Sequence, residues 1–567
     1  MRKRWAARPV PCLHLSSVSE LHGLPASLAL LLARRGYSGK ILEDFLNPDI
    51  NTLSSWKNLG GIMEAAERIV RAVANTEKIL VHGDFDADGI TATAVVYRAL
   101  SELGADISYY VPDRFIEGYG IGSSAVQFCE ENGIDLLITV DCGITANEHI
   151  NALNSTNIDT VITDHHQAGD QLPFAKAIVN PALDGDVRHS TLAGVGVAWM
   201  VMNGVYELMN ADASSLQELL QLVAIGTVTD VVDLIDDNRI LVSEGLKVMR
   251  RIPLPGVSAL AKSASVDLES CNSSHLAFYI GPRLNACGRV GHAKQAVDLL
   301  LAMNEQETEE LLAPVAENNR IRKQYERDVE KQVKGLTAEL HDPRCIVLAG
   351  EGWHRGVVGI VASRLVSRFG VPVILISLEG NYGYGSARSI PGISIHSLLG
   401  RIQDEYMILS SFGGHPMAAG LTILRDNVQL LKEHMETLLS EKKWDEYLGS
   451  VLYLDGSLEE KDYTIETVRA LSRLEPFGSG NSMPVWLARG AYAIQWRAVG
   501  KNRNHLSCNL KIGSRIFRAI GFNMVEKQSL FSSRVDLAFT LDIDTWRNDG
   551  SIQLMLKDIR RTGKQNS

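Results

Sequence analysis

The chain has 567 residues, of which 45% are hydrophobic and 22% are charged, as in ordinary globular proteins. At roughly 150 residues a domain, this length predicts three or four domains. The composition excludes collagenous and disordered chains, and no stretch approaches the ~20 consecutive apolar residues of a membrane-spanning helix. The net charge of −11 disfavours nucleic acid as a partner unless basic residues gather locally or metal ions offset the acids.

Two features bear on the cellular compartment. The apolar run at residues 28–32 is too short for the core of a secretory signal, so we expect a cytoplasmic protein without a membrane segment. The seven cysteines are scattered and form no C-x-x-C pair, which disfavours a disulfide framework or a thiolate zinc site.

The first part of the chain predicts an α/β domain. Residues 1–55 carry mixed helical signals, and we expect them to pack against the domain that follows. From Lys78, apolar runs alternate with helical segments, and strands are predicted at residues 78–82, 107–112, 135–141 and 159–166. This alternation predicts a doubly wound parallel sheet within residues 56–304, with ligands bound at the carboxyl ends of the strands.

Three further segments are predicted after this domain. Residues 305–340 carry an apolar stripe at Tyr325, Val329, Val333, Leu336 and Leu340, which predicts a long connecting helix. A second α/β domain is expected over 341–449. Short strand-like runs dominate 450–567 and favour a small β-barrel such as an oligonucleotide-binding (OB) fold.

Acidic and imidazole side chains gather directly after the predicted strands. His82, Asp84, Asp86 and Asp88 fall within seven positions at a strand-to-helix turn. Carboxylates crowded in this way repel one another unless hard cations bind them, although an aspartate in such a turn also caps helices.

Later segments add similar groups. Asp141 ends one predicted strand, and Asp164, His165 and His166 close another. Asp230 and Asp233 follow a helical stretch, where either could be a helix cap, and spacing alone does not choose between them. Oxygen and imidazole ligands without thiolate suit Mg²⁺ or Mn²⁺ and indicate hydrolysis at phosphorus.

These motifs resemble those of the DHH phosphoesterase superfamily: FDADG (85–89), VDCG (140–143), DHH (164–166) and GTVTDV (226–231). Five further motifs are similar to those of the superfamily's bacterial exonucleases that are specific for single-stranded DNA. They are VPDRFIEGYG (111–120), GPRLNACGR (281–289), GWHRGVVGIVASRL (352–365), GSARS (385–389) and GGHPMAAG (413–420). The resemblance covers nearly the whole chain.

The resemblance implies a site for two divalent cations, Mg²⁺ or Mn²⁺. It assigns one ion to His82, Asp86 and Asp141, and the other to Asp88, Asp141, His165 and Asp230, with Asp141 as the bridge. Asp84 is then a nearby carboxylate. His166 is placed beside the scissile phosphate, where it donates a hydrogen bond or assists the leaving oxygen.

The resemblance and the charge pattern of the C-terminal segment both indicate contacts to the nucleic acid. The glycine-rich GGHPMAAG motif reads as a phosphate-binding turn, because backbone N–H groups can approach an anion closely there. Cationic and aromatic side chains at 491–523, a stretch without Asp or Glu, suit a single-strand groove, with Phe517 as one stacking platform. The residues assigned to phosphate or DNA are Arg114, Tyr119, Arg283, Asn285, Arg289, Arg388, Gly413, Gly414, His415, Trp496, Arg497 and Arg518.

The expected function is that of a single-strand-specific 5′-to-3′ DNA exonuclease that releases nucleoside 5′-monophosphates in DNA repair and recombination. The family implies a single-strand-binding protein and a helicase as partners, and we expect a monomer. One alternative is an enzyme of the same superfamily that cleaves oligoribonucleotides or cyclic dinucleotides, which the basic C-terminal segment disfavours. The other is a non-catalytic replication scaffold, which the complete set of acids disfavours.

Overall fold

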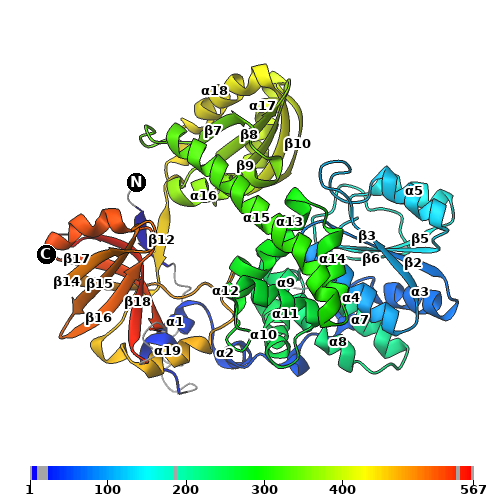
Figure 1. The fold of residues 1–567 in the computed structure, drawn as a ribbon, viewed down its shortest axis with the longest axis horizontal. Helices are drawn as coiled ribbons and strands as arrows, with labels where there is room; N and C mark the ends of the chain where they lie inside the picture. The colour runs from blue at the N-terminus through cyan, green and yellow to red at the C-terminus, as the bar shows by residue number, and fades with distance from the viewer. Residues whose placement is uncertain (1–2, 9–22, 184–187, 545–549, 564–567) are drawn as a thin grey trace. The chain divides into compact units, whose positions relative to one another are not determined.

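The computed structural model describes residues 3–8, 23–183, 188–544 and 550–563. The chain divides into two compact units (Figure 1). Unit 1 comprises residues 1–43, 323–473 and 483–567, and unit 2 comprises residues 44–322 and 474–482. The division into five segments made from the sequence stays a prediction.

Unit 2 is built on a five-stranded sheet with the strand order β3-β2-β4-β5-β6. All neighbouring strands are parallel. The strands are β2 (Lys78–Gly83), β3 (Asp106–Tyr110), β4 (Leu136–Val140), β5 (Asp159–Thr163) and β6 (Ala177–Val179). The doubly wound parallel sheet predicted from the sequence is confirmed.

Helices cover both faces of this sheet because successive strand residues point to opposite sides. In β2, Ile79 and Val81 join a large core with the helices α3 (Ile62–Ala74), α4 (Ala87–Glu102) and α7 (Gly194–Leu208). Leu80, between them, joins a separate core with α5 (Ser123–Asn132) and α6 (Asn147–Ser155). Strands buried on both faces explain the uninterrupted apolar runs in the sequence.

The rest of unit 2 is helical. Its elements pack on the core that also contains α4 and α7. They are α8 (Ser214–Glu218), α9 (Leu220–Asp230), α10 (Asp236–Arg251), α11 (Pro255–Ala264), α12 (Ser273–His275), a π-helix (Leu276–Ile280), α13 (Gly281–Val290) and α14 (Lys294–Leu301).

A long helix, α15 (Glu305–Leu336), begins in unit 2 and ends in unit 1. Its Val329 and Val333 are buried against α16 (Arg355–Phe369), as the apolar stripe predicts. Leu336, by contrast, is exposed, and Leu340 lies beyond the helix. The helix thus ends four residues before the predicted boundary at residue 340.

Unit 1 contains a mixed five-stranded sheet with the order β10-β11-β9-β8-β7. Only β7 and β8 are parallel, and the other pairs are antiparallel. The elements are β7 (Ile346–Glu351), β8 (Val373–Glu379), β9 (Tyr382–Arg388), β10 (Leu409–His415), β11 (Ala418–Leu424), α17 (Ile395–Tyr406) and α18 (Val428–Leu439).

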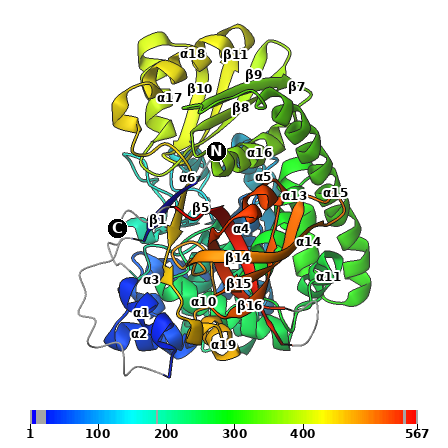
Figure 2. The ribbon, with the colours of Figure 1, turned by 90° about the vertical axis from the view of Figure 1, so that its left-hand side faces the viewer.

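Unit 1 also contains the predicted C-terminal barrel. Antiparallel pairing of β14 with β17 closes the sheet, so that the barrel strands have no open edge there. Figure 2 shows β14, β15 and β16 side by side. The elements are β13 (Gly456–Ser457), β14 (Trp486–Val499), β15 (His505–Ile512), β16 (Arg515–Gly521), β17 (Val535–Ile543), β18 (Ile552–Arg561) and the helix α19 (Ile465–Ser472), which lies between β13 and β14.

The N-terminal residues differ from the prediction. We expected residues 1–55 to pack against the next domain, but residues up to 43 belong to unit 1. The strand β1 (Arg4–Ala7) pairs in parallel with β12 (Val451–Leu454), and α1 (Ala26–Arg34) lies near α19. The helix α2 (Gly39–Leu46) spans the boundary. Pairing of strands so distant in sequence leaves no local sequence pattern that could have predicted it.

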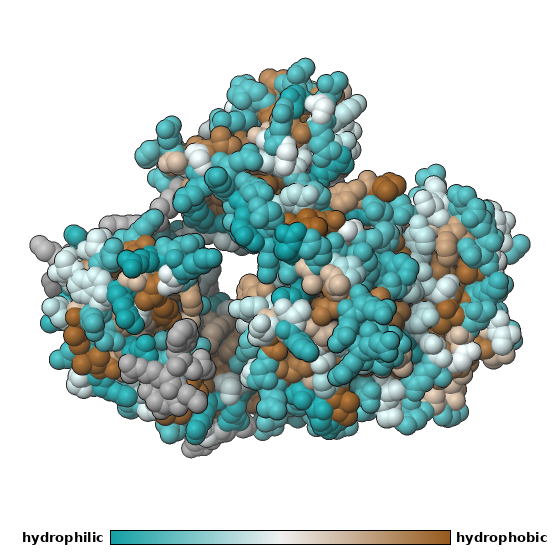
Figure 3. All heavy atoms as spheres, viewed as in Figure 1, coloured by the Kyte–Doolittle hydropathy of each residue, from teal (hydrophilic) through white to brown (hydrophobic). Residues whose placement is uncertain are grey.

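The hydropathy of the surface and the state of the cysteines are those expected from the sequence. On the face drawn in Figure 3, hydrophilic residues prevail and hydrophobic ones are scattered. The segments that the structure describes include no helix whose length and apolar character would let it cross a bilayer. Six cysteines are buried and free, and Cys12 lies outside the described residues.

Candidate metal centre

The carboxyl ends of β2, β4 and β5 meet at one edge of the unit 2 sheet, because these strands are parallel neighbours. Asp84 follows β2, Asp141 follows β4, and Asp164 to His166 follow β5. Three segments distant in sequence therefore deliver acidic and imidazole groups to one place, as expected for a doubly wound sheet.

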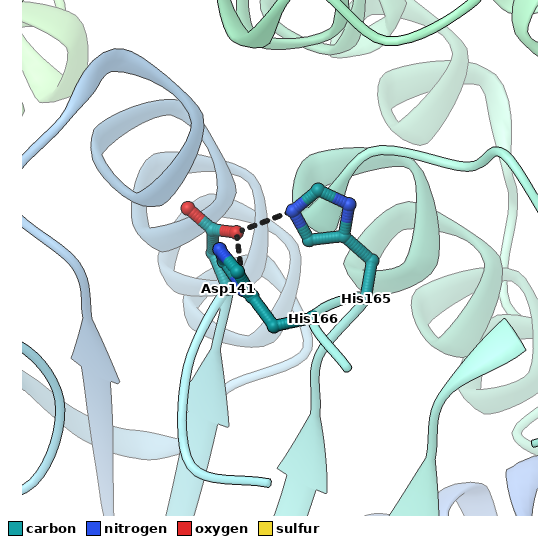
Figure 4. A group of neighbouring side chains, drawn as sticks. All are labelled: Asp141, His165 and His166. Carbon is teal, nitrogen blue, oxygen red and sulfur yellow. Dashed lines mark ion pairs between the residues drawn. The ribbon is translucent and has the colours of Figure 1, made fainter. Parts of the chain in front are cut away.

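Asp141 and His165 form the centre of this cluster. Oδ1 of Asp141 lies 3.1 Å from Nε2 of His165 and 3.9 Å from Nδ1 of His166 (Figure 4). The same His165 nitrogen lies 3.8 Å from Asp88 and 3.7 Å from Asp230. One imidazole nitrogen therefore faces three carboxylates.

The ligand atoms fall into three overlapping groups, each with atoms within 4.8 Å of one another: Asp84 with Asp86 and Asp141; Asp141 with His165 and His166; and Asp88 with His165 and Asp230. Asp141 belongs to two of the groups, as does His165. The predicted residues are thus brought together, but His82 belongs to none of the three groups.

His82 is buried within the sheet end. Its ring stacks on Tyr110, and its Nδ1 lies 3.6 Å from Sγ of Cys142. Burial lowers the pKa of His82 to about 4, so that the ring is neutral and its Nε2 can act as a ligand. A role for His82 at a metal stays a prediction.

Asp86 and Asp88 have second roles in the local fold. Oδ1 of Asp86 caps α4 by accepting from the N–H groups of Asp88 and Gly89. The two oxygens of Asp88 accept from the N–H groups of Gly194 and Val195, at 2.7 and 2.9 Å. Helix capping and metal binding, alternatives at the level of the sequence, are therefore compatible here, because each carboxylate has further lone pairs.

Two glycines let helices approach the carboxylates closely. A Cβ on Gly194 would lie 2.6 Å from Oδ1 of Asp141. A Cβ on Gly226 would lie 2.9 Å from Oδ1 of Asp88. Neither glycine was predicted to lie at the site, because a single glycine in a helical segment is too common a signal to indicate it.

The electrostatics of the cluster call for a cation. Burial, with added repulsion from neighbouring carboxylates, raises the pKa values of Asp84, Asp88 and Asp141 well above the ordinary value. The same causes raise the pKa of Asp230 to about 7. Divalent cations bound among these oxygens would remove the repulsion.

Unpartnered polar atoms support this fit. Among the described residues, four buried atoms of the cluster have no hydrogen-bond partner: His82 Nε2, Asp84 Oδ1, Asp141 Oδ1 and His165 Nε2. Burial lowers the pKa of His165 to about 4, so it too is neutral and able to donate a lone pair. The oxygens and neutral imidazoles present are the ligands that Mn²⁺ and Mg²⁺ accept in proteins.

His166 differs from His165 in its partners. Its Nδ1 lies 2.8 Å from the buried carboxylate of Asp164 and 3.0 Å from the hydroxyl of Tyr119. Although burial opposes it, the hydrogen bond to Asp164 raises the pKa of His166 to about 9. The ring is therefore protonated at neutral pH, so that Nε2 carries a proton while Nδ1 is held by Asp164.

Comparisons with known proteins agree with this geometry. Models of the DHH family N-terminal domain, the DHHA1 domain and the RecJ OB domain match residues 78–227, 342–441 and 454–558. The single-stranded-DNA-specific exonuclease RecJ of Bacillus subtilis is 36% identical over 551 residues, which cover 96% of this chain and 69% of that protein. The RecJ of Haemophilus influenzae is 36% identical over 540 residues, which cover 91% and 92%. The chain belongs to the RecJ family.

A solved structure extends the likeness to the whole fold. The crystal structure of RecJ from Thermus thermophilus in complex with Mn²⁺ matches with a TM-score of 0.86 and 28% identity. The match covers 99% of this chain and 80% of that one. A second crystal structure of that protein is in complex with Mg²⁺.

The loop 111–120, one of the motifs shared with RecJ, borders the cluster. The guanidinium of Arg114 lies 4.8 Å from the centre of the Phe85 ring. The hydroxyl of Tyr119 donates to the backbone oxygen of Asp141 at 3.3 Å, while its ring is 49% exposed. Tyr119 therefore both positions His166 and presents an aromatic face to solvent.

The 281–289 motif forms α13, and its polar side chains are largely engaged within unit 2. Oδ1 of Asn285 accepts from the N–H of Ala87, at the first turn of α4. Arg283 donates to Ser263 and to the backbone oxygen of Tyr279. A phosphate would have to displace these bonds, so the structure favours a packing role for Arg283. Arg289 lies in the last turn of α13.

The remaining RecJ motifs lie in unit 1. Gly413, Gly414 and His415 end β10 and are exposed, and Ala418 of β11 pairs with both His415 and Arg388. The motifs GSARS (385–389) and GGHPMAAG (413–420) thus come together at one end of the sheet. Gly414 has a φ of 132°, in the region that favours glycine.

On the barrel, a hollow of about 170 Å³ is lined in part by Trp496, Arg497 and Arg518. Trp496 is 40% exposed, and Arg518 forms an ion pair with Asp544. Phe517 was expected as a stacking platform, and this expectation is wrong, because its side chain is 4% exposed and packs on Tyr463 inside the barrel.

Proposed function

We propose that this chain is a metal-dependent exonuclease that degrades single-stranded DNA from its 5′ end and releases nucleoside 5′-monophosphates. The observation that carries the proposal is the convergence of Asp141 and His165 with five further metal-binding candidates at one edge of the sheet. The relatives named as single-stranded-DNA-specific exonucleases support the choice of substrate. The 5′ polarity and the monophosphate product come from the family resemblance.

The cofactors we propose are two divalent cations, Mn²⁺ or Mg²⁺. Asp84 and Asp86, with His82 nearby, would hold one cation, and Asp88, His165 and Asp230 the other, with Asp141 shared between them. Such a pair neutralises charge on the phosphodiester and activates water for in-line attack at phosphorus.

The chain's own residues orient the substrate and move a proton. The backbone N–H groups of Gly194 and Val195 hold both oxygens of Asp88, which fixes its direction. Asp164 keeps the His166 ring protonated and oriented. His166 can then donate a proton from Nε2 to the 3′ oxygen that leaves when the terminal nucleotide is cut off.

Groups outside the metal site would bind the nucleic acid. We assign phosphate contacts to Arg114, Arg289 and Arg388 and to the turn at Gly413 to His415, because guanidinium and backbone N–H groups suit phosphate oxygens. The exposed Trp496 would stack on a base, with Arg497 near the backbone. Arg518 is a weaker candidate, since Asp544 already offsets its charge.

The setting follows from the proposed activity. An exonuclease for single strands acts on DNA that has been unwound or resected, so we propose a cytoplasmic role in DNA repair and recombination. A helicase that supplies single strands and a single-strand-binding protein that covers them are the partners we expect.

The decisive experiment follows the digestion of an oligonucleotide labelled at one end. With Mn²⁺, a 3′-labelled strand should shorten step by step, a 5′-labelled strand should release labelled mononucleotide at once, and a blunt duplex should resist. Asp141→Asn should abolish digestion, while Asp170→Asn, an exposed aspartate near the same sheet, should retain it. Shortening from the 3′ end, or full activity of Asp141→Asn, would refute the proposal.

A further inference from the structure

Unit 1 contains a cationic pocket that belongs to neither the metal centre nor the barrel hollow at Trp496. We define the arginine pocket by its charged lining residues: Arg8, Arg34, Arg35, Arg489, Arg560 and Asp455. Its volume is about 350 Å³. The lining comes from β1, α1, the β12–β13 connection, β14 and β18, so chain segments from both ends of the sequence build it.

The single acidic residue of the pocket is already saturated. Oδ1 of Asp455 accepts from Arg8 at 2.8 Å and from Arg35 at 3.2 Å. Oδ2 accepts from the N–H of Val485 at 2.9 Å. The carboxylate is buried, so these bonds fix it, and it cannot offset the charge of any further arginine.

Three guanidinium groups of the pocket have no carboxylate partner among the described residues. Arg34 donates to the backbone oxygen of Asp455 at 3.2 Å. Within the described part of the chain, the side chains of Arg489 and Arg560 form no hydrogen bond or ion pair with another residue. Both are exposed, yet they line a hollow rather than an open face. The six charged residues leave an excess of four positive charges at the pocket.

An aromatic wall completes the pocket. The Trp5 ring is fixed by a hydrogen bond from its Nε1 to Asp558 at 2.7 Å, and the guanidinium of Arg560 lies 3.9 Å from its centre. Asp558 does not neutralise Arg560, because Lys527 forms an ion pair with it. The charge of Arg560 therefore stays available beside an indole surface.

These features select a ligand class. Guanidinium groups match phosphate oxygens in pairs, and a bound anion would offset the repulsion between the clustered guanidinium groups. A nucleoside triphosphate carries about four negative charges at neutral pH, equal to the excess at the pocket, and its base can pack on an aromatic wall. A volume of about 350 Å³ is within the range of small-molecule sites and is too small for a folded partner.

We propose that the arginine pocket is a binding site for a nucleoside triphosphate, separate from the metal centre and independent of divalent cations. Arg34, Arg489 and Arg560 bind the phosphate chain, and Trp5 packs against the nucleoside. Because the ligand contacts β1, β14 and β18, it links the N-terminal strand to the barrel and stabilises unit 1.

Calorimetric titration of the full chain with ATP in the presence of EDTA tests the site, since EDTA removes any cation that could recruit nucleotide to the metal centre. Tripolyphosphate should bind more weakly than ATP, and AMP more weakly still. The double substitution of Arg489→Gln and Arg560→Gln should weaken ATP binding by about tenfold or more, equivalent to ~1.4 kcal/mol. Arg251→Gln, an exposed arginine of unit 2, is the matched control and should bind ATP normally.

Three results would overturn the proposal. They are the absence of ATP binding in EDTA, unchanged ATP affinity in the double variant, and tighter binding of hexaglutamate than of ATP, which would make the pocket a site for acidic peptides. Equal affinity for ATP and tripolyphosphate would remove the role of Trp5. Because both substituted arginines are exposed, a near-normal melting temperature will show that the variants fold.

Discussion

Asp141 and His165 face each other across 3.1 Å at the ends of two adjacent parallel strands. Asp141 reaches this position with a backbone φ of 59°, in the left-handed region that residues other than glycine rarely adopt. Such strain is retained where the surrounding structure requires the conformation. The pair joins the groups of ligand atoms on either side into one site.

Asp230 and Asp233 provide a matched pair for testing the metal centre. Asp230 lies 3.7 Å from Nε2 of His165, whereas Asp233 accepts from the hydroxyl of Ser479 at 2.6 Å and belongs to no ligand group. Asp230→Asn should lower exonuclease turnover by at least ~10²-fold, because it removes a carboxylate that holds the cation. Digestion of labelled single strands at saturating Mn²⁺ measures this.

Asp233→Asn should keep turnover within about twofold of the unmodified chain and cost about 1 kcal/mol of stability through the altered hydrogen bond. If the two substitutions reduced turnover equally, the assignment of Asp230 over Asp233 would be wrong.

Mn²⁺ affinity should depend on pH through the carboxyl group of Asp230. Burial and Asp86 raise its pKa to about 7 in the folded chain, so below that pH a proton must leave before the cation binds. The dissociation constant should therefore fall by up to about tenfold from pH 6 to pH 7 for each proton displaced, and it should level off above.

The raised pKa of Asp230 also makes the stability of the metal-free chain depend on pH, and this stability falls as pH rises. A carboxyl with a raised folded pKa stabilises the fold fully below its unfolded pKa, and this stabilisation is lost as pH rises through about 7. In EDTA the melting temperature should fall from pH 5 to pH 7, and Mn²⁺ should reduce the fall. A pH-independent Mn²⁺ affinity across this window would contradict the prediction.

Gly194 and Gly196 test the close approach of α7 to the site. A Cβ on Gly194 would lie 2.6 Å from the Asp141 carboxylate, so Gly194→Ala must displace that side chain. Mn²⁺ affinity should fall by about tenfold or more, with a stability cost of roughly 1–3 kcal/mol. Calorimetry with Mn²⁺ and thermal unfolding in EDTA separate the two effects.

Gly196→Ala is the control, because its nearest contact would be the end of the Leu192 side chain at 3.3 Å. It should keep Mn²⁺ affinity and gain a little stability from the better helix former. Equal losses in both variants would indicate a general effect on α7 rather than contact with Asp141.

The sequence predicts the location of the site well because parallel strands align their carboxyl ends. Asp84 follows one predicted strand, Asp141 and His165 lie at the ends of two others, and the fold brings them together. The choice between Asp230 and Asp233 needs coordinates, since Asp230 is the last residue of α9 and faces His165, whereas Asp233 lies beyond the end of that helix.

The orientation of Phe517 was predicted wrongly and the pairing of β1 with β12 was not predicted, and both have physical causes. Phe517 was assigned outward because it alternates with cations, yet β16 buries Phe517 and Ala519 and leaves Arg518 between them less buried. Period-two alternation was present in the sequence, but which face points inward depends on how the barrel closes. The pairing of β1 with β12 rests on backbone hydrogen bonds between distant segments, which side-chain patterns do not encode.

Val231, directly after Asp230, has a φ of 69°, and its side chain is 68% exposed. A β-branched residue in the left-handed region is strained by roughly 1–2 kcal/mol, and exposure means that little packing compensates. Val231→Gly relieves this strain but also increases the conformational entropy of the unfolded chain, which offsets part of the gain. The melting temperature in EDTA should therefore rise by about 2 °C. Ile252→Gly is the control, because Ile252 is 47% exposed at an ordinary φ of −141° and glycine there should lower the melting temperature. A fall of similar size in both variants would show that the backbone at Val231 is not strained.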